Sequence, residues 1–127
     1  ARIFDEAIEP DADISGDPLL LQLLINNLLE NAVKYSDKES PISIMLAKKH
    51  GFVIMQVVDQ GIGVPENERK MIFKKFYRIG NEYTRKKQGT GLGLYICALI
   101  AAEHRAEIIV KANKPKGSIF EVNFKVE

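Results

Sequence analysis

The sequence predicts an α+β sandwich, in which about three helices cover one face of a mixed, mostly antiparallel sheet of five strands. Apolar runs come in two pairs, within residues 42–58 and 107–126, and a short turn joins each pair as in a β-hairpin. Two further segments, residues 19–35 and 91–103, are predicted to be helices. At 127 residues the chain is long enough for one domain with one core.

The first half of the chain begins with a predicted edge strand at residues 2–9, where apolar and polar side chains alternate loosely. Asp17 and Pro18 then favour a helix start, because Asp caps free N–H groups and Pro fits the first helical position. The helix that follows is apolar nearly all round and extends to about Tyr35. The first predicted hairpin comes next, with strands at Ile42–Lys49 and Gly51–Val58.

The second half starts with a glycine-containing turn at Asp59–Pro65 and a predicted short helix at Glu66–Phe76. Residues 77–90 are polar, basic and rich in turn formers, and an irregular segment of this length is typically functional or disordered. A helix from about Gly91 to Glu103 precedes the second hairpin, whose strands are predicted at Glu107–Ala112 and Ser118–Val126.

Charge and cysteine content exclude several classes of protein. The chain has 18 Lys and Arg against 17 Asp and Glu, so its net charge of +1 gives no general attraction to nucleic acid or to an anionic membrane. Cys97 is the one cysteine, which excludes an internal disulfide and a Cys-x-x-Cys zinc site. No apolar run reaches the roughly 18–20 residues of a membrane span. We expect a cytoplasmic domain, taken from a longer protein because it begins without Met.

Polar side chains interrupt the apolar helix at Asn27, Asn31 and Lys34, which share one helical face. Burying an Asn without partners costs about 1–3 kcal/mol, so this face needs hydrogen-bond partners. One interpretation is that the amides cap neighbouring loops while Lys34 extends to solvent. The other is a ligand groove, since amide oxygens suit Mg²⁺ and Lys suits phosphate. Tyr35 is either a core residue or a stacking partner for a planar base.

An acidic residue follows the second apolar strand, within the run Asp59-Gln-Gly61-Ile-Gly63. Asp-x-Gly is a common turn sequence and is explained structurally by that alone. A carboxylate at the mouth of an apolar pocket can also accept a hydrogen bond from an exocyclic amine, such as the one on adenine. Both interpretations stay open at this point.

Three glycines, spaced two apart, open the last helix in the run Gly89-Thr-Gly91-Leu-Gly93. A flexible hinge would explain them, but free N–H groups at a helix start also form an anion site, and we favour phosphate binding. The P-loop pattern is absent because no glycine is followed by Lys. The dinucleotide pattern Gly-x-Gly-x-x-Gly is absent as well, since Glu66 and Ile96 stand where its third glycine would be.

Taken together, four segments resemble the N, G1, F and G2 boxes of the ATP-binding domain of sensor histidine kinases, in that order. They are Asn27–Ser36, Asp59–Gly63, Ile72–Arg78 and Gly89–Leu94. The resemblance implies the Bergerat fold for residues 1–127, with ATP and Mg²⁺ as ligands.

The resemblance also implies individual roles. Asn31 would bind Mg²⁺, with Asn27 close to the metal and the phosphates, and Lys34 would contact phosphate. Tyr35 would stack beside adenine and Asp59 would accept its amine.

Other implied roles fall on the loops. Gly61, Ile62 and Gly63 would shape the pocket, residues 77–90 would form a mobile ATP lid, and Arg78 would point toward the γ-phosphate. Backbone amides would come from the G2 run: Gly89, Thr90, Gly91, Leu92, Gly93 and Leu94. Ile72, Phe73 and Phe76 would pack against the domain that carries the phosphoacceptor histidine.

The function implied is transfer of the ATP γ-phosphate to a histidine on a separate dimerisation domain, absent from this chain, which starts a phosphorelay to a response regulator. We expect this piece to be a monomer, the cytoplasmic part of a sensor that is itself free or membrane-anchored. An anti-sigma-type serine kinase of the same fold and a non-catalytic nucleotide-sensing module remain as alternatives.

The chain departs from the family at two places and differs from its hydrolysing relatives at a third. His104-Arg-Ala replaces the frequent His-Gly-Gly, which should alter a turn and not the chemistry. Hydrolysing relatives carry a Glu at the position of Asn27, and an amide cannot act as a base, so we expect very slow ATP hydrolysis. Whether Glu30 substitutes for that Glu, and whether the basic run 85–87 contacts phosphate, stays open.

Overall fold

The computed structural model describes residues 4–8, 14–36, 39–77 and 92–125. In chain order its elements are β1 Phe4–Ile8, α1 Pro18–Tyr35, β2 Ile42–Lys49, β3 Phe52–Val58, the 3-10 helices η1 Glu66–Glu68 and η2 Met71–Phe73, α3 Gly93–Glu103, β4 Glu107–Ala112 and β5 Ser118–Lys125. The strands and the two α-helices lie close to their predicted bounds, which confirms the predicted α+β class.

The five strands form one sheet in the order β1-β2-β3-β5-β4. The strand β1 runs parallel to β2, and the other neighbouring pairs are antiparallel. Antiparallel neighbours need only a tight turn, whereas a parallel pair needs a crossover connection, and α1 lies in that crossover between β1 and β2. The sheet is therefore mixed and mostly antiparallel, as predicted.

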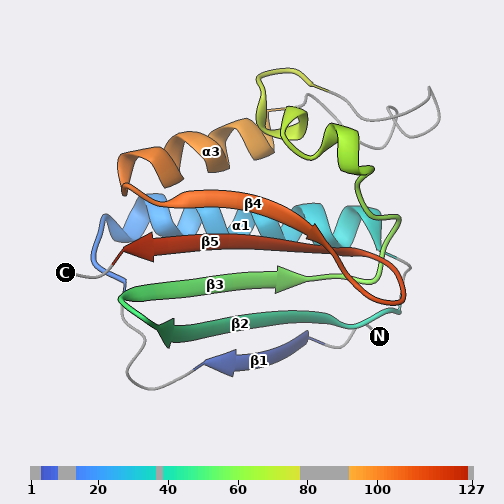
Figure 1. Cartoon of the computed structure of the whole chain (residues 1–127), viewed down its shortest axis with the longest axis horizontal. Coiled ribbons are helices and arrows are strands. Elements are labelled where there is room, and N and C mark those ends of the chain that lie inside the picture. The colour runs from blue at the N-terminus through green and yellow to red at the C-terminus, as the bar shows by residue number, and fades with distance from the viewer. Residues whose placement is uncertain (1–3, 9–13, 37–38, 78–91, 126–127) are drawn as a thin grey trace.

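The core lies between the sheet and its two α-helices, which cover one face of the sheet (Figure 1). Val57 of β3 pairs directly with Phe120 of β5, and both side chains are buried against that layer. Leu28, from α1, is also fully buried in this cluster. Alternate residues of the same two strands, such as Gln56 and Glu121, belong to the opposite face because side chains alternate along a strand.

Helices α1 and α3 pack side by side and antiparallel. At one end, the ring nitrogen Nε2 of His104 accepts the backbone N–H of Asp17, at 3.1 Å. Further along, the Cys97 thiol donates to the Leu24 carbonyl at 3.8 Å. This pairing fixes the helix that carries Asn27 relative to the start of α3. In the described part of the chain no helix is both long and apolar enough to cross a membrane.

The predicted helix at residues 66–76 is instead two short 3-10 helices, η1 and η2. Ile72 is buried in the core, and the Phe73 ring meets the Phe120 ring edge-on at 6.3 Å. Phe76 has a positive φ of 65°, which a right-handed helix cannot contain. Tertiary packing of the apolar side chains therefore decides the conformation here, and local helix propensity does not.

Candidate functional site

Asp59 follows the end of β3 directly and is only 2% exposed. Its carboxylate oxygen Oδ1 accepts the backbone N–H of Gly61 at 2.9 Å and that of Ser118 at 3.2 Å. Its own N–H donates to the Ser118 carbonyl at 2.9 Å. The second oxygen, Oδ2, makes no hydrogen bond within the described part of the chain. The structure thus orients a buried carboxylate and leaves one oxygen available as an acceptor.

Burial raises the pKa of Asp59, although the N–H groups of Gly61 and Ser118 oppose this by stabilising the charged form. A buried charge without a full set of partners destabilises the protein. A ligand that donates a hydrogen bond to Oδ2 would supply the missing partner. This carboxylate oxygen therefore suits a neutral donor such as an exocyclic amine.

The β4–β5 turn supports Asp59, a contribution that no local sequence pattern predicts. The side-chain amide of Asn113 donates to the Asp59 carbonyl at 2.8 Å. Gly117 has a φ of +108°, and a Cβ atom there would lie 2.0 Å from the same carbonyl oxygen. In the sequence, Asn113 and Gly117 lie in the short turn of the second predicted hairpin, and Ser118 begins its second strand. Their turn-forming chemistry was visible in the sequence, but their partner was not.

The glycine turn after Asp59 packs against the end of α1. A Cβ atom on Gly61 would lie 2.2 Å from the Tyr35 carbonyl oxygen, which also accepts the N–H of Ile62 at 3.3 Å. Gly63 has a φ of +76°, a conformation that favours glycine. Tyr35 is half-buried and burial raises its pKa to about 12, while the Ile62 side chain is exposed. The predicted N and G1 segments therefore meet through backbone contacts.

The polar face of α1 points partly toward α3. The Asn27 side-chain amide donates to the Leu23 carbonyl at 3.0 Å, and its Oδ1 lies 3.2 Å from where a Cβ atom on Gly93 would stand. Asn31 is half-buried, and no side-chain hydrogen bond of Asn31 is found in the described part. Lys34 is exposed one turn further on. The two amides and the ammonium group thus line the side of α1 nearest the start of α3.

Helix α3 begins at Gly93, with Leu92 as its capping residue. No side chain caps this helix start. Leu94 packs against the core, so it holds the first turn in place. N–H groups at such a start have no partner within the helix and suit an anion. Four predicted site residues lie outside the described part of the chain: Arg78, Gly89, Thr90 and Gly91.

Within the described part, no group of three or more His, Cys, Asp and Glu side chains is placed to hold a metal. A divalent cation would instead find the amide oxygen of Asn31. Mg²⁺ is commonly held by few protein ligands together with water and substrate phosphates. The side chains present are therefore compatible with magnesium brought by a nucleotide.

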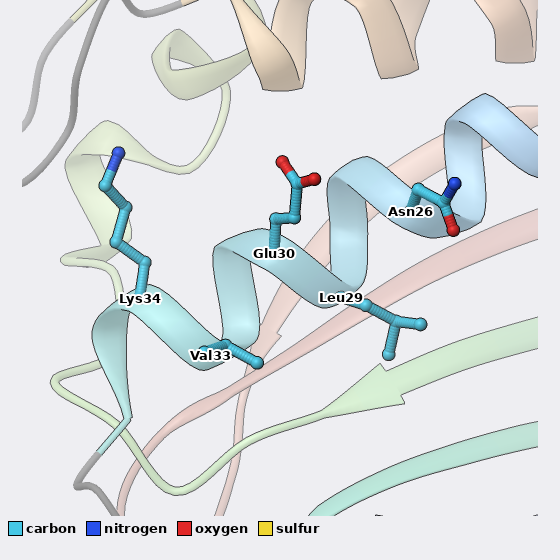
Figure 2. Close-up of a pocket in the computed structure, with 5 residues that line it drawn as sticks. All are labelled: Asn26, Leu29, Glu30, Val33 and Lys34. Carbon is cyan, nitrogen blue, oxygen red and sulfur yellow. The ribbon is translucent and has the colours of Figure 1, made fainter.

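An open groove of about 610 Å³ follows the neighbouring face of α1, lined by Asn26, Leu29, Glu30, Val33 and Lys34. Figure 2 shows Glu30 and Lys34 extending to the same side of the helix, away from Leu29 and Val33. Only Lys34 belongs to both this groove and the predicted site. Glu30 therefore borders the candidate site and points into solvent.

The predicted contact surface for a second domain is smaller than the sequence suggested. Ile72 is buried in the core and is not available to a partner in this conformation, whereas Phe73 is half-buried against the core. Phe76 is 61% exposed and carries the Lys75 ammonium 5.2 Å from its ring centre.

The chain belongs to the family of histidine kinase-, DNA gyrase B- and HSP90-like ATPases, whose profile matches residues 16–127. It is 39% identical over 114 residues to the sensor protein CiaH of Streptococcus pneumoniae, and this covers 90% of the chain but 26% of CiaH. The chain thus spans about a quarter of that relative.

Solved structures show the same fold. The mycobacterial sensor histidine kinase MprB matches with a TM-score of 0.84 and 26% identity over 97% of this chain and 80% of that one. Full-length ShkA, solved in complex with AMPPNP, matches with a TM-score of 0.80 and 25% identity over 98% of this chain and 26% of that one. The four motif segments thus belong to an ATPase domain whose relatives are sensor histidine kinases.

Proposed function

We propose that this domain binds Mg-ATP and transfers the γ-phosphate to a histidine on a separate dimerisation domain. The single observation that carries the proposal is the buried Asp59, oriented by two backbone N–H groups and with one carboxylate oxygen left for a donor. The polar face of α1 and the start of α3 offer groups for phosphate. The AMPPNP complex of ShkA supports a nucleotide as the ligand.

Each group has a distinct task in this proposal. Oδ2 of Asp59 accepts the adenine amine, and Tyr35 packs beside the base. Lys34 and the N–H groups at the start of α3 bind phosphate oxygens, while Asn27 lies near them. Asn31 would hold Mg²⁺, which when bound neutralises phosphate charge. Arg78 contacts the γ-phosphate in the proposed complex.

Phosphoryl transfer depends mainly on positioning and on neutralisation of charge. The groups above could provide these, so the proposal still requires a histidine that accepts the phosphoryl group. Neither described histidine suits that role. His50 lies in the exposed β2–β3 turn, and both ring nitrogens of His104 are near backbone partners. We therefore propose an acceptor histidine in a dimerisation domain, a response regulator downstream, and a cytoplasmic location for this domain, monomeric on its own.

Titration of the domain with an ATP analogue, with and without Mg²⁺, tests the binding step. We expect Asn31→Ala to remove most of the Mg²⁺ dependence, and Lys34→Ala to weaken binding roughly tenfold through a lost charge-assisted contact. Lys48→Ala, on the exposed end of β2, is the matched control and should bind as the wild type does. Equal affinity in all of these proteins, with or without Mg²⁺, would exclude the assigned site.

Mixing the domain with [γ-³²P]ATP and the histidine-bearing domain of a sensor-kinase relative tests the transfer. The proposal expects label that is lost in acid, as a phosphorus–nitrogen bond to histidine is. Acid-stable label on a serine would indicate the serine-kinase alternative instead. Tight binding without transfer to any acceptor would indicate a nucleotide-sensing module.

A further inference from the structure

The β4–β5 turn and the residue that follows it hold the main chain of Asp59 at both of its polar groups. The Asp59 N–H donates to the Ser118 carbonyl at 2.9 Å, and the Asp59 carbonyl accepts the side-chain amide of Asn113 at 2.8 Å. Ser118 also donates its own N–H to Oδ1 of Asp59, at 3.2 Å. The conformation of Asp59 therefore depends on a segment more than 50 residues away in the sequence.

The Asn113 side chain is itself held in one orientation. Its Oδ1 accepts the N–H of Lys114 at 2.9 Å, so the NH₂ group of the amide faces the Asp59 carbonyl. The backbone N–H of Asn113 donates to the Gly117 carbonyl at 3.0 Å, which closes the turn. Gly117 has a φ of +108°, and its lack of a Cβ lets the turn lie close to the same Asp59 carbonyl. Asn113 is thus a donor that is already oriented toward Asp59.

We propose that Asn113 is a positioning residue for base recognition by Asp59, and that it thereby helps to select purines with an exocyclic amine. The Asp59 carbonyl belongs to a planar peptide unit, so the bond from Asn113 restricts how the chain continues toward Gly61. The Gly61 N–H is one of the two donors that orient Oδ1 of Asp59. With the main chain and Oδ1 held, Oδ2 keeps one direction. This inference rests on the proposed function, in which Oδ2 accepts the adenine amine.

Two substitutions remove the donor at this position. Asn113→Ala removes the whole amide, whereas Asn113→Asp keeps an oxygen that can accept the Lys114 N–H and removes only the NH₂ group. Asn67, exposed in η1, provides Asn67→Ala as the matched control. Neither Asn113 nor Asn67 contacts the nucleotide in the proposed function. A loss that both Asn113 variants share is therefore assigned to the missing donor.

The test compares the affinities of the domain for ATP and for purine riboside triphosphate, each with Mg²⁺, measured calorimetrically. The second ligand is ATP without its exocyclic amine, so the ratio of the two affinities reports the contact of that amine. We expect both Asn113 variants to reduce the preference for ATP by roughly three- to tenfold, the effect of about one hydrogen bond. The affinity for purine riboside triphosphate should be unchanged, and Asn67→Ala should behave as the wild type.

A second comparison places the effect at Asp59. In an Asp59→Asn background, Asn113→Ala should leave the ratio of affinities unchanged, because the acceptor that it positions is already gone. An equal loss of both affinities in the Asn113 variants would indicate a general structural role and would overturn the inference, as would an unchanged preference for ATP. If Asp59→Asn itself leaves the preference for ATP intact, the role of Asp59 in the proposed function fails first, and the two failures are thereby distinguished.

Discussion

At the scale of single residues, Asp59 shows how this fold holds a charged group in an apolar place. Two backbone N–H groups satisfy one carboxylate oxygen, and burial acts against the charge on the group as a whole. Because burial disfavours the charge, we propose that the carboxylate serves ligand binding and not stability.

Asp59→Asn separates these two effects. Burial raises the pKa of Asp59 in the folded protein above its ordinary 3.8, so the charged form costs stability as the pH rises through and beyond that range. We expect Asp59→Asn to raise the melting temperature of the free domain at pH 7, and the gain to vanish below about pH 3.8. Nucleotide affinity should fall roughly 10- to 100-fold, because an amide N–H would face the adenine amine.

Thermal melts from pH 3 to pH 8 and nucleotide titration measure the two effects. Gln60→Glu, an exposed change of charge on the next residue, is the control and should alter neither. A variant that is less stable at pH 7, or that binds nucleotide as tightly as the wild type, would contradict the assignment of Asp59 to the adenine amine.

Some residues of the candidate site contact neighbours in the sequence, and others contact residues far away in it. Asp59, Gly61 and Gly63 are adjacent in sequence, and their spacing alone indicated a special turn. The partners Asn113 and Ser118 are 54 and 59 residues away, so nothing in the local pattern linked them to Asp59. Prediction failed here because tertiary contacts, and not residue type, give these residues their role.

At the scale of elements, hairpins and long helices were predictable because alternation and apolar periodicity persist over many residues. The segment 66–76 was not, because Ile72 and Phe73 take their conformation from the core.

The outer face of the sheet carries a hydrogen-bond network that the periodicity does not reveal. Its acceptor is Glu121, which is 5% exposed and accepts hydrogen bonds from Gln56, Asn123 and Lys111. Those contacts join three neighbouring strands.

Glu121→Gln tests whether these contacts stabilise the sheet. Burial acts to raise the pKa of Glu121, but the hydrogen bonds from Gln56, Asn123 and Lys111 outweigh it and lower the pKa below its ordinary 4.5. The carboxylate therefore stabilises the fold above about pH 4.5, and this stabilisation is lost as the pH falls through the lowered pKa.

At pH 7 we expect Glu121→Gln to reduce the free energy of unfolding by about 1 kcal/mol. The difference from the wild type should narrow steadily in denaturant titrations below pH 4.5. Glu107→Gln, an exposed change on β4, should show no such dependence. If the difference in unfolding free energy between Glu121→Gln and the wild type were constant with pH, the charge on Glu121 would not contribute to stability.

At the scale of the whole molecule, the candidate site depends on the antiparallel packing of α1 and α3, two helices that are far apart in the sequence. The contact of His104 with Asp17 fixes one end of the pair, and Asn27 faces Gly93 at the other. The sequence predicted both helices and the polar face of the first one. Their relative direction follows only from the packing, since no local pattern specifies which helix lies beside which.

This placement predicts that the isolated domain hydrolyses ATP very slowly. Asn27 stands nearest the start of α3, and its amide cannot take a proton from water. Glu30, one turn along, is exposed and extends to the same side of α1 as Lys34 (Figure 2). Phosphate release by the isolated domain in saturating Mg-ATP should therefore stay well below about 1 per second, the low end of typical enzyme turnover. Asn27→Glu, which supplies a carboxylate, should raise the rate, while Asn26→Glu on the neighbouring face should not. Rapid turnover by the wild type that Asn31→Ala abolishes would show that another group activates water in this site.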